Sequence, residues 1–95
     1  MLSLRFSDQS LQELDEIWEY IAQDSPLAAE SVIQNLRQLC KTLAAFPQAG
    51  RKRDDVSPGV RSLPKGNFVI FYKVLPGELL IIRILHGSRG QVDFG

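Results

Sequence analysis

Four basic side chains in the second half of the chain have the chemistry to act on, or bind, an anionic group. Arg83 interrupts the apolar run "ELLIIRILHGSRG", which reaches His86, the only histidine, and continues to Arg89. Arg61 lies in a shorter segment upstream. Arginine stays protonated and serves as a cation, whereas the pKa of histidine suits proton transfer near neutral pH. A buried guanidinium is costly unless it is paired, so Arg83 requires an ionic partner or a ligand.

The spacing of these residues favours binding over catalysis. Arg83 and His86 are three residues apart, which puts them on opposite faces of a regular strand. The "GSRG" that follows the histidine supplies no tyrosine or second acid–base group. We therefore predict a binding surface for a partner at the end of a sheet, formed by Arg61, Arg83, His86 and Arg89. In the alternative, catalytic hypothesis the active residues are Arg61, Arg83 and His86.

Three of these residues also have a purely structural interpretation. Arg83 has possible internal partners in the acids of the first helical segment, such as Glu13 or Glu16. A hydrogen bond at the end of a strand accounts for His86 without any proton transfer. Arg61 suits a solvated charge on an edge strand, because charges there discourage pairing with other chains. These interpretations stay open at the level of sequence.

Opposite charges are segregated along the chain, although its net charge is zero. Residues 1–50 contain seven acids and three bases, and residues 51–95 contain eight bases and four acids, so the halves carry −4 and +4. This asymmetry indicates either an anionic partner for the second half or neutralisation between the halves. The cluster "RKRDD" at residues 51–55 carries its own acids and no interleaved aromatic residue, which predicts a solvated loop rather than direct DNA binding.

Length and composition predict a single globular domain over residues 1–95. The chain is 44% hydrophobic and 23% charged, as in ordinary globular domains. No apolar stretch reaches the length of a membrane span, and the N-terminal segment lacks the features of a signal peptide. One cysteine and one histidine are too few ligands for a structural zinc site. We therefore expect a cytoplasmic protein that needs no metal or cofactor and does not contact a membrane.

Hydrophobic periodicity predicts a short strand and then two helices in the first half. Residues 2–6 alternate between apolar and polar, and Ser7 suits an N-cap. A second cap at Ser25, followed by Pro26, begins a helix that ends near residues 46–47. Apolar residues recur at helical spacing in both segments, at Leu11, Leu14, Ile17, Trp18 and Ile21, and then at Ala29, Val32, Ile33, Leu36, Leu39, Cys40 and Leu43. Within this stripe Cys40 is expected to be a core thiol.

The second half predicts three strands in an antiparallel meander. The segments "VRSL", "NFVIFYKVL" and "ELLIIRILH" are joined by short turns that contain glycine and proline. The last two are apolar on both faces, so each is expected to lie in the centre of the sheet, with Tyr72 packed in the core. The two helices can cover one face. The other face is then expected to be an exposed apolar surface for a partner.

In order and spacing, these segments resemble the RelE/ParE superfamily of bacterial type II toxins over nearly the whole chain. The resemblance rests on "DSPLAAESVIQNL" at the start of the second helix, "FPQAGRKRDDV" between the layers, "GVRSLPKGNFVIFYKV" in the central hairpin, and "IIRILHGSR" at the close of the last strand. It implies an α+β fold with an N-terminal strand, an antiparallel helical hairpin and a three-stranded antiparallel meander. It also implies a cognate antitoxin, whose C-terminal segment wraps the toxin in a hetero-oligomer.

Two activities compete within this superfamily. ParE-like members poison DNA gyrase by binding it, and RelE-like members are similar to ribosome-dependent endonucleases that cut messenger RNA. The closing segment resembles the ParE branch, and the residues do not assemble an acid–base site, so we predict a gyrase-binding toxin rather than an enzyme. A RelE-like endonuclease is one alternative. An inactive homologue that only binds its antitoxin is another.

Overall fold

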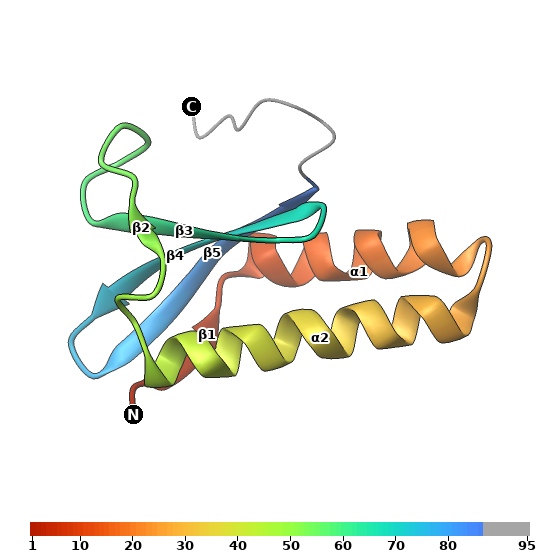
Figure 1. The fold of residues 1–95 in the computed structure, drawn as a ribbon, viewed down its shortest axis with the longest axis horizontal. Coiled ribbons are helices and arrows are strands. Elements are labelled where there is room, and N and C mark those ends of the chain that lie inside the picture. The colour runs from red at the N-terminus through yellow and green to blue at the C-terminus, as the bar shows by residue number, and fades with distance from the viewer. Residues whose placement is uncertain (87–95) are drawn as a thin grey trace.

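The computed structural model describes residues 1–86, which form two helices packed on one face of a five-stranded sheet (Figure 1). The sheet has the order β1-β5-β4-β3-β2, in which β1 is parallel to β5 and all other neighbours are antiparallel. The elements are β1 (Ser3–Phe6), α1 (Asp8–Ala22), α2 (Pro26–Ala45), β2 (Arg51–Lys52), β3 (Val60–Lys65), β4 (Phe68–Leu75) and β5 (Glu78–His86). This architecture confirms the predicted α+β fold.

Both helices begin at the serines that the sequence indicates. The hydroxyl of Ser7 accepts a hydrogen bond from the backbone N–H of Ser10 at 3.0 Å, and Ser25 accepts from Ala28 at 3.1 Å. Each bond satisfies an N–H group that has no partner within its helix. Pro26 follows the second cap at the first helical position, where its missing N–H costs nothing. Neither helix is long and apolar enough to cross a membrane.

The two most apolar strands, β4 and β5, lie inside the sheet, as predicted. β1 pairs with one side of β5, so the first strand of the chain borders the last strand that the structure describes. At the other edge, β2 is a two-residue strand in the segment that was expected to be only a loop. It pairs with Arg61 and Ser62 of β3. The sheet is therefore wider than the predicted meander by one strand on each side.

The main core lies between the sheet and the helical hairpin. Its buried members are Leu14, Leu36, Cys40, Leu43, Ile70, Tyr72, Leu79, Ile81 and Ile84. Cys40 is fully buried, and its burial raises the pKa of the thiol to about 12. The thiol therefore stays protonated at neutral pH, where only the thiolate is nucleophilic. The prediction of a core cysteine is confirmed.

The opposite face of the sheet is better covered than the sequence suggested. Phe71 of β4 is fully buried, and the guanidinium carbon of Arg53 lies 5.5 Å from the centre of its ring. Arg53 also donates a hydrogen bond to Ser62 and forms an ion pair with Asp55. The prediction of an uncovered apolar face is therefore wrong for this part of the sheet. The "RKRDD" segment is correspondingly more than a solvated loop, because one of its arginines lies against an aromatic ring.

A β-bulge changes which residues of β5 point to the core. The register runs from Tyr72↔Ile81 to Phe71↔Arg83, so Ile82 is an extra residue without an opposite partner in β4. Along β5, Leu79 and Ile81 are buried, and the next buried residue is Ile84. Because side chains alternate between faces, an inserted residue reverses the faces of everything beyond it. The bulge therefore lets an apolar strand place Arg83 outside the core.

The hydroxyl of Tyr72 forms hydrogen bonds with residues 47 and 50 in the segment that joins α2 to β2. It donates to the carbonyl oxygen of Pro47 at 2.7 Å and accepts from the N–H of Gly50 at 2.8 Å. Burial raises the pKa of this hydroxyl, so it remains a donor at neutral pH. A Cβ at Gly50 would lie 2.5 Å from the Tyr72 oxygen and 2.9 Å from the carbonyl oxygen of Ser62. Only glycine fits this position without movement of the backbone.

We predict that Tyr72→Phe lowers the free energy of unfolding by about 1–3 kcal/mol, because it leaves a buried N–H and a carbonyl without their partner. Tyr20→Phe is the matched control, because this tyrosine is exposed and its replacement should change stability by less than about 0.5 kcal/mol. Urea denaturation followed by circular dichroism measures both. Equal stability of the two variants would contradict the role given to the Tyr72 hydroxyl.

Candidate functional site

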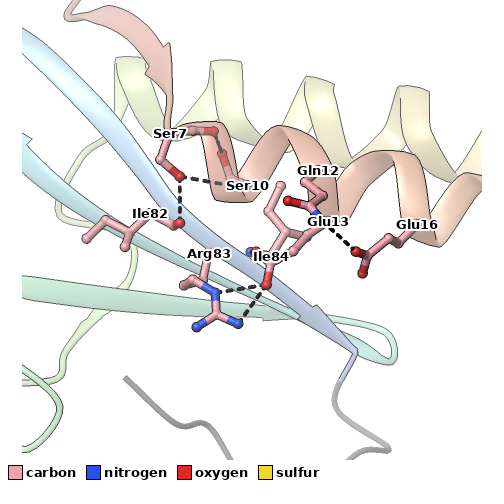
Figure 2. A network of polar contacts seen from close by, with 8 residues as sticks. All are labelled: Ser7, Ser10, Gln12, Glu13, Glu16, Ile82, Arg83 and Ile84. Carbon is pink, nitrogen blue, oxygen red and sulfur yellow. Dashed lines mark hydrogen bonds and ion pairs between the residues drawn. The ribbon is translucent and has the colours of Figure 1, made fainter. Parts of the chain in front are cut away.

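The site predicted around Arg83 is organised by one carboxylate, that of Glu13 on α1 (Figure 2). One of its oxygens, Oε2, lies 2.8 Å from both Nε and Nη2 of Arg83. The other, Oε1, accepts a hydrogen bond of 2.9 Å from the backbone N–H of Ile84. The Glu13 side chain thus pairs with the Arg83 guanidinium and also accepts a hydrogen bond from a backbone N–H of β5.

This arrangement is possible because β1 ends before β5 does. The parallel pairing stops at Phe6↔Ile81, and β5 continues to His86 with no further strand of residues 1–86 on that side. The backbone of Ser7 continues the contact by donating its N–H to the carbonyl oxygen of Ile81 at 2.9 Å. Beyond this point two backbone groups of β5, the carbonyl oxygen of Ile82 and the N–H of Ile84, are satisfied by side chains of α1 and its cap.

Ser7 sets the position of α1 on this edge. Its hydroxyl donates to the carbonyl oxygen of Ile82 at 2.8 Å while it accepts from the N–H of Ser10 (Figure 2). The same side chain therefore caps the helix and bonds to the extra residue of the bulge. Glu13 lies less than two helical turns further along α1, which brings its carboxylate to the next positions of β5.

The ion pair between Arg83 and Glu13 is largely shielded from water. The exposed fractions of the two side chains are 16% and 12%. The internal partner that the sequence left as an alternative is therefore present, whereas Glu16 contacts Gln12 on the same helix. Removal of one partner from a buried pair leaves a desolvated charge, which costs far more than the loss of a surface pair.

His86 ends β5 on the face opposite to Arg83. It pairs with Phe68, whose ring packs against the core, and the two rings meet edge to face with 5.1 Å between their centres. Arg83 is opposite Phe71 instead, and the register between the two positions is regular. The two side chains therefore start from different faces of the strand, as their spacing predicted. Arg89 lies outside the described residues.

Arg61 lies away from the end of β5. Its Nη1 donates to the carbonyl oxygen of Gly50 at 2.7 Å, the residue that Tyr72 also binds. In the sheet Arg61 is level with Ile81, whereas His86 is level with Lys65. Four residues of strand correspond to about 13 Å, and two strand spacings add to this separation. Within residues 1–86, Arg61 and His86 therefore do not form one cluster.

Two contacts near the candidate residues were not evident from the sequence. Glu13 was considered only as an ion-pair partner, and nothing in the chain indicated that it also binds the backbone of Ile84. Arg53 was assigned to a solvated loop, although it lies against Phe71. Both contacts join segments that are far apart in sequence or lie on an irregular loop. No local periodicity reports such contacts.

We predict that Glu13→Gln lowers the free energy of unfolding by about 2–3 kcal/mol, because Arg83 loses its carboxylate in a shielded position. Glu16→Gln is the control, since Glu16 is exposed and its change should cost less than about 0.5 kcal/mol. Urea titration of the two variants tests the difference. A loss below 0.5 kcal/mol for Glu13→Gln would show that this pair does not stabilise the fold.

A family model and individual relatives match this chain and agree with each other. A family model described as "ParE toxin of type II toxin-antitoxin system, parDE" matches residues 4–90. Toxin ParE1 of Mycobacterium tuberculosis is 34% identical over 82 residues, which cover 84% of this chain and 83% of the relative. Toxin RelE2 of Caulobacter vibrioides is 35% identical over 81 residues, which cover 85% of this chain and 90% of the relative.

A solved structure agrees with these sequence matches. The chain is similar to one described as "Chromosomal ParDE TA system from P. aeruginosa", with a TM-score of 0.76 and 28% identity. The similarity covers 90% of this chain and 96% of that one. With a family model that spans most of the chain and relatives above 30% identity, the conclusion is direct: the chain belongs to the ParE toxin family of type II toxin–antitoxin systems.

Proposed function

We propose that this toxin acts by binding DNA gyrase and that a cognate antitoxin neutralises it. The observation that carries the proposal is the separation of the candidate catalytic groups. Arg61 lies in β3, two strands away from β5, and its guanidinium donates to the carbonyl oxygen of Gly50. The guanidinium of Arg83 is hydrogen-bonded to Glu13. General acid–base cleavage needs a base, an acid and cations around one phosphate. A binding mechanism requires only a surface of suitable shape and charge.

A second candidate function is ribosome-dependent cleavage of messenger RNA. It is favoured by the position of His86, a half-buried imidazole at the end of the sheet, and by a relative that carries the name RelE2. Under this hypothesis His86 transfers the proton, and Arg61 and Arg83 stabilise charge on the phosphate. It requires Arg61 to approach His86 across the sheet, a rearrangement that binding does not require.

The antitoxin partner is supported by charge as well as by family. The solved relative is described as a ParDE system, and the basic second half of this chain offers arginines and lysines to an acidic segment. In this hypothesis Arg61, Arg83, His86 and Arg89 belong to the surface that contacts antitoxin or target. Toxin and antitoxin then form a hetero-oligomer in the cytoplasm.

We predict that the protein encoded by the neighbouring reading frame stabilises the toxin. A ligand that binds only the folded state at about 100 times its Kd adds about 2.7 kcal/mol. For a domain of this size, that addition raises Tm by roughly 10–20 °C. Differential scanning calorimetry of the toxin, with and without the purified neighbour, measures the shift. An unchanged Tm at saturating concentrations would exclude this neighbour as the antitoxin.

We predict that purified toxin added to gyrase supercoiling reactions accumulates cleaved plasmid and leaves messenger RNA intact on translating ribosomes. His86→Gln should have a mild effect if the protein binds, and should reduce cleavage by roughly two to four orders of magnitude if it is a nuclease. Primer extension on the message gives the second readout. Cuts in the messenger RNA at codon positions, with gyrase supercoiling unaffected, would contradict the gyrase proposal and identify the ribosome as the target. Inactivity in both assays, together with a Tm raised by the neighbouring protein, would identify an inactive homologue that only binds its antitoxin.

The role of Arg83 needs a control for folding. Arg83→Glu places a carboxylate beside Glu13, so a loss of function can reflect a damaged fold as well as a repelled partner. The double variant Glu13→Arg with Arg83→Glu restores opposite charges inside the domain while it reverses the charge on β5. If Arg83 contacts the partner, the double variant should recover the part of Tm that depends on the ion pair, but not binding. The N–H of Ile84 stays without its acceptor in this variant, because an arginine side chain cannot accept a hydrogen bond. Recovery of both would assign Arg83 to the fold alone.

A further inference from the structure

The end of the helical hairpin projects from the body of the domain. α1 and α2 run along the longest axis of the molecule, and Figure 1 shows both helices continuing past the end of the sheet. At 1.5 Å per residue, the 20 residues of α2 extend over about 30 Å. We call the projecting part, residues 15–30 with the turn between the helices, the hairpin arm. A partner can contact such an arm from several sides.

Every charged residue of the hairpin arm is an acid, and the nearest bases in the sequence are Arg5 and Arg37. Glu13, just outside the arm, is neutralised by Arg83. The acids of the arm itself are exposed, and none of them forms an ion pair with a residue in 1–86: Asp15, Glu16, Glu19, Asp24 and Glu30. Like charges held close together repel one another and attract a cationic partner.

Large apolar side chains are exposed among these acids. The exposed fraction is 85% for Leu27, 65% for Tyr20 and 38% for Trp18. The indole Nε1 of Trp18 donates to Oε2 of Glu30 at 3.4 Å, which joins apolar and acidic side chains across the two helices. Tyrosine and tryptophan are enriched where proteins contact each other. No group of acids in residues 1–86 is arranged to hold a metal ion, so a protein partner accounts for the arm better than a cation does.

The partner that fits the hairpin arm has a cationic surface. A second copy of this chain fits poorly, because three of its arginines, Arg53, Arg61 and Arg83, are already hydrogen-bonded to groups within their own domain. An enzyme that holds DNA, in contrast, must carry lysines and arginines along the path of the duplex, where they neutralise phosphates. Carboxylates of the arm can take the place of those phosphates.

We propose that the hairpin arm is the part of the toxin that contacts gyrase, and that it docks on a lysine- and arginine-rich surface of the kind with which this enzyme holds DNA. Carboxylates such as Glu19 and Asp24 pair with these cations, while Tyr20 and Leu27 pack on the apolar stems of the same side chains. The proposal rests on gyrase as the target and specifies which part of the toxin meets it and with what chemistry. It leaves the basic half of the chain to the antitoxin.

A charge reversal in the hairpin arm tests the contact with the target. The whole toxin is bound to immobilised gyrase holoenzyme, and Kd is measured by biolayer interferometry at low and at high salt. Glu19→Lys should weaken binding by about tenfold and reduce its dependence on salt, because an attraction becomes a repulsion. Glu78→Lys at the start of β5 is the matched control. It makes the same change in charge, loses only an exposed ion pair with Arg5, and should alter Kd by less than about twofold.

The outcomes separate this proposal from the choice of target. A Kd that Glu19→Lys leaves unchanged, or that both variants weaken equally, would overturn the docking of the arm and leave gyrase as the target. Failure of the unaltered toxin to bind gyrase would overturn both. Tm values equal to that of the unaltered toxin confirm that the variants fold.

Leu27→Ala tests the apolar part of the contact independently of charge. Because Leu27 is almost fully exposed, its truncation should leave Tm unchanged, but it should weaken gyrase binding by about threefold to tenfold. Val74→Ala in β4 is the matched control, an exposed apolar residue outside the arm, and should alter Kd by less than about twofold. A Leu27→Ala variant that binds gyrase as tightly as the unaltered toxin would overturn the proposed packing of the arm on its target.

Discussion

The carboxylate of Glu13 is the interaction on which the end of the sheet depends. β5 is longer than β1 beside it, so its last residues present backbone groups where the part of the chain that the structure describes places no further strand. Glu13 satisfies one of these groups at Ile84 and neutralises Arg83 with its other oxygen. The helix is therefore attached to the sheet by polar contacts at its first turns and by apolar packing along the remainder. Loss of either type of contact affects the other, because both fix the same helix.

The contact with Glu13 also gives a structural explanation for Arg83, an arginine in an apolar strand. A charged residue at such a position suggests a ligand, but here a shielded carboxylate within the domain meets it. The bulge at Ile82 makes the meeting possible, since it moves Arg83 out of the alternation that would otherwise bury it. A contact with a partner then has to coexist with an internal ion pair.

Local signals were sufficient for both helices and for the longer strands, but they missed β2 and did not predict the contacts between elements. Caps at Ser7 and Ser25 mark both helix starts because capping is decided within four residues. The central positions of β4 and β5 follow from apolar residues on both faces. The bulge, the bond from Glu13 to Ile84 and the cover that Arg53 provides for Phe71 all depend on packing between distant segments. The choice of site residues stays a prediction, whereas their contacts within the fold required the three-dimensional structure.

The parallel contact between β1 and β5 has a consequence for how the toxin folds during synthesis. The neighbour of β1 in the sheet, β5, is the last strand that the structure describes, and more than 70 residues of chain separate the paired positions. Contacts of such high sequence separation form late, because the loop between them must close first. A nascent chain therefore contains both helices and the strands β2, β3 and β4 before β1 can find its neighbour. The order β1-β5-β4 is complete only after translation has passed β5, so the first strand of the chain is the last of these to be paired.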